Sequence, residues 1–190
     1  DMVPVLTEIA AGSPGAIFFP IFQPAGDFVA DQAPGVSGLD GVVLLGADGL
    51  QVQTFMELPQ ADGMYLSGPD LRYGTNANQS TGVTAEKFLA DYEANNGNAP
   101  EAPFWAHSYD AATLLLEAIK AASHVHDGNL EIDRAGVREY LDNLSGYEGI
   151  IGTLSCDDFG DCGAQRITVV QNDSADFAGS IENVVFSFAP

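Results

Sequence analysis

Positively charged residues are scarce in this sequence. The 190 residues include 6 Lys and Arg against 27 Asp and Glu, which gives a formal net charge of −21 at pH 7. Residues 1–71 contain no Lys, Arg or His, and they carry nine carboxylates: Asp1, Glu8, Asp27, Asp31, Asp40, Asp48, Glu57, Asp62 and Asp70. Such a surface repels phosphate backbones, which argues against nucleic acid as a partner. Most of this charge is expected to be solvated surface, and attraction of a cationic ligand would need one particular carboxylate in a pocket.

Long apolar runs are also missing. The longest, such as "VVLL" at residues 42–45, is far too short to span a bilayer. No signal peptide is visible at the start. The opening residues, "DMVPVLTEIAAG", resemble a segment from the middle of a folded domain. The length and the 46% of hydrophobic residues are typical of one globular domain or two small ones.

The motifs of common enzyme classes are absent too. The sequence has no G-x-S-x-G elbow, no Walker-type phosphate loop and no H-E-x-x-H zinc motif. We therefore expect no enzymatic activity, no cofactor and no metal. His124 and His126 have metal-binding side chains, but two histidines at the end of a helix are more often solvated. His107 is expected to be a packed or hydrogen-bonded histidine rather than a catalytic base.

Cysteine is limited to Cys156 and Cys162, in the stretch "IGTLSCDDFGDCGAQR". The aspartates between them, Asp157, Asp158 and Asp161, suggest a calcium loop, but the alternating ligands and the final acid of an EF-hand are missing. Zinc would need two more ligands, and none is close in the sequence. The pattern favours a turn between two β-arms whose cysteines form a disulfide, which indicates an oxidising compartment.

Strands and helices alternate in the first seventy residues. Short apolar strands are predicted at 16–22, 41–46 and 63–67, with helical segments before and between them. Pro20 should end or fray the first strand. Near-continuously apolar strands that alternate with helices are typical of an α/β fold with a parallel sheet and flanking helices.

The rest of the chain is predicted to be mainly helical and then β-like. A stretch rich in Gly, Asn, Ser and Pro follows at 69–82, as expected for a linker or crossing segment. Helices are predicted from Thr84 to a stop at Gly97, from Pro103 to His124, and from Asp133. The last forty residues are predicted to form a hairpin and a final strand.

Open parallel sheets bind ligands beyond the carboxyl ends of their strands. This rule points to residues 22–23, 47–49 and 68–70. Asp48 is the strongest candidate among them, because small neighbours let a ligand approach the backbone and its carboxylate can pair with an ammonium group. From the motif alone, a turn or a helix cap at Asp48 and Gly49 is the favoured interpretation.

Five stretches in order resemble the later half of the leucine/isoleucine/valine-binding proteins, the type I periplasmic substrate-binding components of ABC transporters. They are "DMVPVLTEIAAGSPGAIFFPIFQP", "VVLLGADGL", "ADGMYLSGP", "FWAHSYDAATLLLEAIKAA" and "YEGIIGTLSCDDFGDCG". The resemblance implies two α/β lobes, joined by crossing strands, that close over a small ligand. It implies that residues 1–69 are part of the second lobe and 70–149 the helical part of the first lobe after a hinge crossing. Residues 150–190 would then hold a further hinge crossing and the C-terminal β-hairpin and strands.

The resemblance also implies a ligand-binding site. Asp48 matches an acid that binds the α-ammonium group of the ligand, with Gly49 beside it, and this match reverses the preference for a plain turn. Phe22 matches an aromatic that lines the pocket, and Phe104 matches an aromatic of the other lobe that touches the ligand. Two departures are expected to reshape the pocket: "FPIF" replaces the usual glycines, and Asp48 is shorter than the glutamate of some members.

The chain has about half the length of that family, so the resemblance implies only part of the two-lobed fold. Either the chain was cut from a longer protein or a companion polypeptide completes it. The implied function is extracellular, periplasmic or cell-surface capture of a small amino acid or amide-like ligand for the membrane permease of an ABC transporter. The alternative is a surface structural or interaction protein that reuses the fold, such as a filament subunit or a sensor ectodomain.

Overall fold

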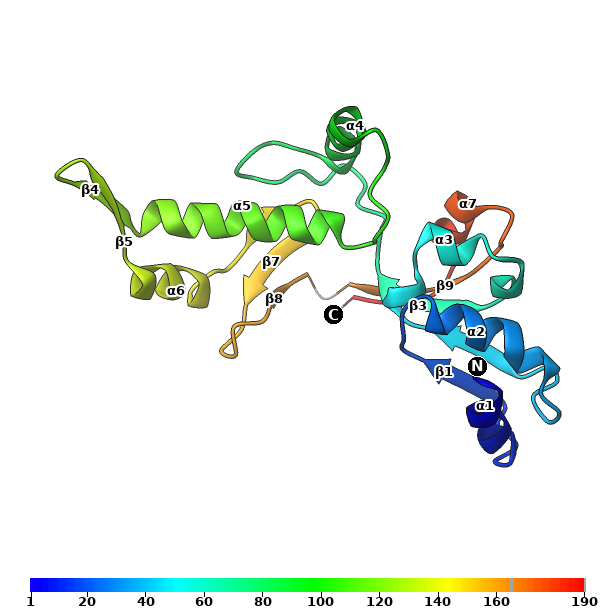
Figure 1. Cartoon of the computed structure of the whole chain (residues 1–190). Coiled ribbons are helices and arrows are strands. Elements are labelled where there is room, and N and C mark those ends of the chain that lie inside the picture. The colour runs from blue at the N-terminus through cyan, green and yellow to red at the C-terminus, as the bar shows by residue number, and fades with distance from the viewer. Residues whose placement is uncertain (165, 190) are drawn as a thin grey trace. The chain divides into compact units, whose positions relative to one another are not determined.

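The computed structural model describes residues 1–164 and 166–189 and divides the chain into two compact units (Figure 1). The first unit consists of Asp1–Leu71, Glu101–Pro103 and Arg166–Pro190, and the second of Arg72–Pro100 and Phe104–Gln165. Within the part of the chain that is described, none of the helices is both long and apolar enough to cross a membrane.

The first unit is built on a five-stranded sheet with the order β1-β2-β3-β9-β10. The strands are β1 (Ala16–Phe19), β2 (Val43–Gly46), β3 (Tyr65–Pro69), β9 (Ile167–Gln171) and β10 (Val184–Phe188). β1, β2 and β3 are parallel, β9 is antiparallel to β3, and β10 is antiparallel to β9. This arrangement confirms the predicted α/β class with a mainly parallel sheet and flanking helices.

Helices and short 3₁₀ turns connect these strands. They are α1 (Val3–Ala10), α2 (Ala25–Gln32), η1 (Ala33–Gly35), η2 (Asp48–Leu50), α3 (Gln53–Met56), η3 (Pro59–Ala61) and α7 (Phe177–Glu182). Side chains of α1, α2 and α3 form one buried cluster with residues of the sheet, and α7 packs against it. As predicted, β1 stops before Pro20, which has no N–H to donate to a neighbouring strand.

The second unit combines three helices with two small sheets. Its elements are α4 (Ala85–Asn96), α5 (Trp105–Ala121), β4 (Ser123–His126), β5 (Asn129–Ile132), α6 (Arg134–Asp142), β6 (Tyr147–Gly149), β7 (Gly152–Cys156) and β8 (Cys162–Gly163). β4 pairs with β5, and β6, β7 and β8 form an antiparallel sheet.

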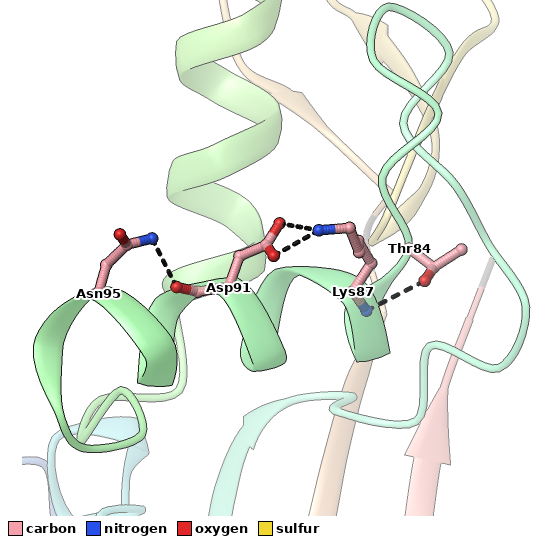
Figure 2. A network of polar contacts seen from close by, with 4 residues as sticks. All are labelled: Thr84, Lys87, Asp91 and Asn95. Atoms are coloured by element: carbon pink, nitrogen blue, oxygen red, sulfur yellow. Dashed lines mark hydrogen bonds and ion pairs between the residues drawn. The ribbon is translucent and has the colours of Figure 1, made fainter.

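Local signals set the ends of α4, as the sequence predicts. The Thr84 hydroxyl accepts a hydrogen bond from the Lys87 backbone N–H at 3.2 Å, and Gly97 ends the helix with φ at 81°. Lys87 also forms an ion pair with Asp91 one turn later, and the Asn95 amide donates to the Asp91 carbonyl at 2.7 Å (Figure 2). These contacts stabilise an exposed helix that has no fully buried residue.

A buried carboxylate ties the second unit together. Asp110 of α5 is 1% exposed, and it accepts hydrogen bonds from the Asn78 amide at 2.8 Å and the Ile151 N–H at 2.9 Å. The Tyr147 hydroxyl donates to the other end of the Asn78 side chain at 3.2 Å. The network therefore links α5, the loop before α4 and the β6–β7 hairpin.

The end of α5 differs from the prediction. The sequence predicts a helix as far as His124, but α5 ends at Ala121 and a β-hairpin of β4 and β5 follows. The hairpin turns at Asp127 and Gly128, whose φ angles are 49° and 79°. A two-residue turn of this kind needs positive φ at both positions, and Asp-Gly between β-forming residues was the signal that could have revealed it.

Candidate functional site

The candidate site lies in the first unit, at the carboxyl edge of its parallel strands. β1, β2 and β3 run in the same direction, so the segments that follow them emerge at the same edge of the sheet. The loop 20–24 follows β1, η2 follows β2 after a single residue, and Asp70 follows β3.

Phe22 and Gly49 are in contact at this edge. A Cβ atom built on Gly49 would lie 2.7 Å from Cδ1 of Phe22 and 3.2 Å from the Ile21 carbonyl oxygen. The Phe22 side chain is nevertheless 70% exposed. Only glycine at position 49 lets the aromatic ring lie this close to the backbone beside Asp48, while most of the ring remains open to a ligand.

Asp48 is the first residue of η2 and is partly buried. The turn closes on its own backbone, since the Leu50 N–H donates to the Ala47 carbonyl at 2.9 Å and the Gln51 N–H donates to the Asp48 carbonyl at 3.0 Å. The Asp48 carboxylate does not cap the turn, and it has no hydrogen bond or ion pair with any residue in the described ranges 1–164 and 166–189. Its negative charge is therefore available to a ligand.

Gln23 fixes the loop that carries Phe22. Its amide nitrogen donates to both carboxylate oxygens of Asp27, at 3.0 and 3.2 Å, and its carbonyl oxygen accepts from the Thr54 hydroxyl at 2.7 Å. The Gly26 N–H donates to the Phe22 carbonyl at 3.0 Å. The loop after β1 is thus bonded to both α2 and α3.

The acid that follows β3, Asp70, is paired with an arginine. Asp70 has a side chain that is 5% exposed and accepts a hydrogen bond from the Arg166 guanidinium at 2.8 Å. An ion pair with arginine neutralises the charge of a buried carboxylate. Asp48, rather than Asp70, is therefore the acid of this edge that can attract a cationic group.

Gln51 is a residue of this region that the sequence did not indicate. It is 2% exposed, and a Cβ atom on Gly68 of β3 would lie 1.9 Å from its side-chain oxygen Oε1. Neither Oε1 nor Nε2 has a hydrogen-bond partner among the residues that the structure describes. The Gln51 side chain packs between the turn after β2 and the end of β3. Its burial could not be predicted from the sequence, because glutamine is usually exposed.

Phe104 belongs to the second unit, whereas the other three predicted residues share the first unit. It precedes α5, is 41% exposed, and its ring contacts the His107 imidazole edge to face at a centroid distance of 5.3 Å. Burial lowers the pKa of His107, and the nearby Asp110 carboxylate opposes that change. His107 is thus a packed, neutral histidine, as the sequence predicts.

Cys156 and Cys162 form the predicted disulfide at the ends of a stapled hairpin. One oxygen of the Asp157 carboxylate accepts hydrogen bonds from the Phe159 and Asp161 N–H groups, both at 2.9 Å. This oxygen stabilises the turn and is occupied by the turn's own backbone. These contacts stabilise the turn between the two paired cysteines.

The two histidines of the β4–β5 hairpin share one carboxylate. His124 Nε2 lies 3.1 Å from one Glu131 oxygen, and His126 Nδ1 lies 3.4 Å from the other. Within residues 1–164 and 166–189, no group of three or more His, Cys, Asp or Glu side chains is arranged to hold a metal ion.

A family profile matches this sequence, and several solved structures have the same fold. A family profile described as "Periplasmic binding protein" matches residues 1–176. A search of curated protein sequences returned no match. Among solved structures, a leucine-binding protein from Thermotoga maritima superposes with a TM-score of 0.70 at 22% identity, over 100% of this chain and 49% of that one.

Two further solved structures have the same fold and similar coverage. A branched-chain amino acid ABC transporter protein from Rhodospirillum rubrum gives a TM-score of 0.58 at 23% identity, over 93% of this chain and 47% of that one. A solute-binding protein from Rhodopseudomonas palustris, in complex with 3,4-dihydroxybenzoic acid, gives 0.62 at 20% identity, over 100% and 48%. The present chain spans about half the length of these proteins.

Proposed function

This chain belongs to the periplasmic binding protein family, and on that basis we propose that it binds a small amino acid or amide-like ligand without catalysing a reaction. The similar solved structures are described as binding leucine or an aromatic acid, or as part of a branched-chain amino acid transporter. Small-molecule binding is the property these descriptions share, and it supports the proposal.

The observation that carries the proposal is the state of Asp48. Its carboxylate is partly buried at the end of β2, beside the close contact of Phe22 with Gly49, and it has no partner within residues 1–164 and 166–189. A partly buried carboxylate forms a strong, charge-assisted hydrogen bond with an ammonium group. We therefore assign Asp48 to the α-ammonium group, Phe22 and Gly49 to the adjacent wall, and Phe104 to the ligand side chain from the other lobe.

Charge favours an amino acid over an aromatic carboxylic acid at this site. Arg166 is the basic residue of the first unit, and it is paired with Asp70. A benzoate-type ligand has a carboxylate but no ammonium group, so the Asp48 carboxylate would repel it. An amino acid instead offers its ammonium group to Asp48, beside the wall formed by Phe22 and Gly49.

The proposal includes where the protein acts and with which partners. The disulfide is compatible with an oxidising, extracellular or periplasmic location. The membrane permease of an ABC transporter would receive the ligand, and a longer parent chain or a companion polypeptide would supply the rest of the fold. In this assignment residues 1–69 belong to the second lobe, 70–149 to the helical part of the first, and 150–190 to a hinge crossing and the final strands.

Isothermal titration calorimetry tests the proposal on the complete protein as its host produces it. The ligands are leucine, isoleucine, valine, alanine and glutamine, with 3,4-dihydroxybenzoate as the comparison. Asp48→Asn keeps the size of the side chain but removes its charge, so we expect affinity for the bound amino acid to fall roughly 10- to 100-fold, as for loss of a charged hydrogen bond. Asp40→Asn is the control, because Asp40 is exposed and precedes β2 at the opposite end of the strand.

Three outcomes would contradict the proposal. The first is absence of binding by every amino acid tested. The second is tighter binding of the benzoate than of any amino acid, and the third is equal affinity of the Asp48→Asn and wild-type proteins.

A further inference from the structure

The sequence contains three N-x-S/T sequons, the acceptor motif of N-linked glycosylation. They are "NQS" at Asn78, "NLS" at Asn143 and "NDS" at Asn172. None of them has proline in the middle position, so the sequence alone does not distinguish between them. The structure does, because the three asparagine side chains differ in burial and in the hydrogen bonds of their amide nitrogens.

Asn78 is a buried asparagine in the loop before α4, with 0% of its surface exposed. The side-chain amide of asparagine has two N–H donors. The Asn78 nitrogen donates to the Asp110 carboxylate at 2.8 Å and to the Thr113 hydroxyl at 2.7 Å, which accounts for both donors. An N-linked glycan replaces one N–H with a bond to a sugar carbon, so it would break one of these contacts inside the second unit.

Asn172 is buried in the first unit in the same way, at 3% exposure. Its amide nitrogen donates to the Met56 carbonyl at 2.8 Å and to the Ala61 carbonyl at 2.9 Å. Both donors are again bonded to the protein, and the nitrogen connects the end of α3 to η3. A sugar on either buried asparagine would break a hydrogen bond of a buried polar group and would find no room in the packed interior.

Asn143 differs from both, because it is exposed in the turn that follows α6. Its amide nitrogen donates to the Glu139 carbonyl at 2.7 Å and makes no second hydrogen bond within residues 1–164 and 166–189. One N–H is therefore free to be replaced by the bond to a sugar. The N–H that remains on the glycosylated nitrogen can still donate to the Glu139 carbonyl, so the end of α6 keeps this contact.

The hydroxyl of this sequon is accessible at the same place. Ser145 is exposed, and its hydroxyl has no hydrogen bond in the part of the chain that the structure describes. The Ser80 hydroxyl of the first sequon, in contrast, lies 2.9 Å from the Tyr147 hydroxyl. The Leu144 carbonyl accepts from the Cys156 N–H at 3.0 Å, which ties the sequon to the disulfide-bonded strand. The acceptor amide and the hydroxyl are thus both exposed on a segment with a fixed backbone.

We propose that Asn143 is an N-glycosylation site and that Asn78 and Asn172 stay unmodified. The host supplies the transferase and the donor, an oligosaccharide on a lipid diphosphate. The Asn143 nitrogen forms a bond to C1 of the first sugar and loses one proton, while the bond from C1 to the phosphate oxygen breaks and the lipid diphosphate leaves with its electron pair. The inference rests on the proposed extracellular, periplasmic or cell-surface location, with which the disulfide agrees, and not on which ligand is bound.

Glycopeptide mapping tests this proposal on the protein produced from its own gene in its host. Trypsin cleaves after Lys and Arg, so the three sequons fall in separate peptides: 73–87, 139–166 and the peptide that starts at 167. We expect mass spectrometry to find a glycan on peptide 139–166 and to find Asn78 and Asn172 unmodified. Absence of a glycan from peptide 139–166, or a glycan on either of the other two asparagines, would overturn the proposal.

Matched variants identify the atom to which the glycan is attached. Asn143→Gln and Ser145→Ala should each remove the glycan, because the first lacks the acceptor asparagine and the second lacks the hydroxyl of the sequon. Ser145→Thr is the control and should keep the glycan. A glycan that persists in Asn143→Gln would be attached elsewhere in the peptide and would contradict the assignment. Ligand affinity plays no part in this mapping, so this proposal and the proposed ligand binding fail separately.

Discussion

The ring of Phe22 lies against the backbone of Gly49, so closely that a Cβ atom at position 49 would be 2.7 Å from the ring carbon Cδ1. The two residues are 27 positions apart in the sequence, and each follows a different strand of the parallel sheet. Their contact defines one wall beside the Asp48 carboxylate.

Gly49→Ala is expected to weaken ligand binding more than it weakens the fold. The added methyl group must displace the Phe22 ring, which is free to move because it is mostly exposed. Overpacking of about 1–1.5 kcal/mol in the bound state corresponds to roughly a tenfold loss of affinity for the bound amino acid. Calorimetry and thermal unfolding measure the two effects. Gly35→Ala is the control, since a Cβ there meets no atom within 4 Å, and equal affinities of the two variants would refute the role of the contact.

Gly68→Ala is expected to destabilise the first unit by about 1–3 kcal/mol. The new methyl group would overlap the end of the Gln51 side chain, which is 2% exposed and must shift within the packed interior. The double variant Gly68→Ala with Gln51→Ala should recover part of this loss, because the two positions are in direct contact. Urea unfolding of both single variants and the double variant provides the test. Strictly additive changes in the free energy of unfolding would show that the clash does not cause the loss.

His107 is expected to make the protein less stable in mild acid. Burial holds its native pKa below the ordinary value of 6.5, so the unfolded state takes up the proton first as the pH falls below 6.5. Stability is therefore fully present above that pH and is lost as the pH falls toward the native pKa. His107→Gln should lose less stability than the wild type between pH 7.5 and 5.5 in urea unfolding. His124→Gln, at an exposed histidine, should follow the wild type, and identical pH slopes for all three proteins would count against the prediction.

The disulfide is expected to contribute only modestly to the free energy of unfolding. It closes a loop over a sequence separation of 6, and so short a loop corresponds to about 2 kcal/mol in the chain-entropy description. Cys156→Ser with Cys162→Ser should lower the free energy of unfolding by that amount without abolishing the fold. A thiol assay on the unreduced native protein should detect no reactive thiol. Two reactive thiols would show that the cysteines are not paired in the native protein.

Several elements of the fold were predictable because their causes are local. Pro20 ends β1, and the Thr84 cap and Gly97 bound α4, each through contacts within a few residues. The β4–β5 hairpin was missed because the predicted helix was extended to His124, over the start of β4, although Asp127 and Gly128 just beyond it are themselves a local turn signal.

The candidate site was predictable only in part. The strand-end rule and the family resemblance both pointed to Asp48, and the structure brings Phe22 and Gly49 to the same edge. The resemblance alone pointed to Phe104, which lies in the other unit. The buried position of Gln51 could not be predicted from its neighbours in the sequence, because it depends on contact with a different strand.

The sequence by itself determined the acidic charge, the α/β alternation, the helix ends and the pairing of the two cysteines, since these depend on composition or on neighbours along the chain. Only the tertiary structure decided which of the two acids at this edge of the sheet is paired. Asp70 forms an ion pair with Arg166 from 96 residues away, while the Asp48 carboxylate has no hydrogen bond or ion pair within residues 1–164 and 166–189. The tertiary structure also decided which face of the sheet is buried, because the register of five strands places Phe18 and Phe188 on the one face that the described helices leave uncovered.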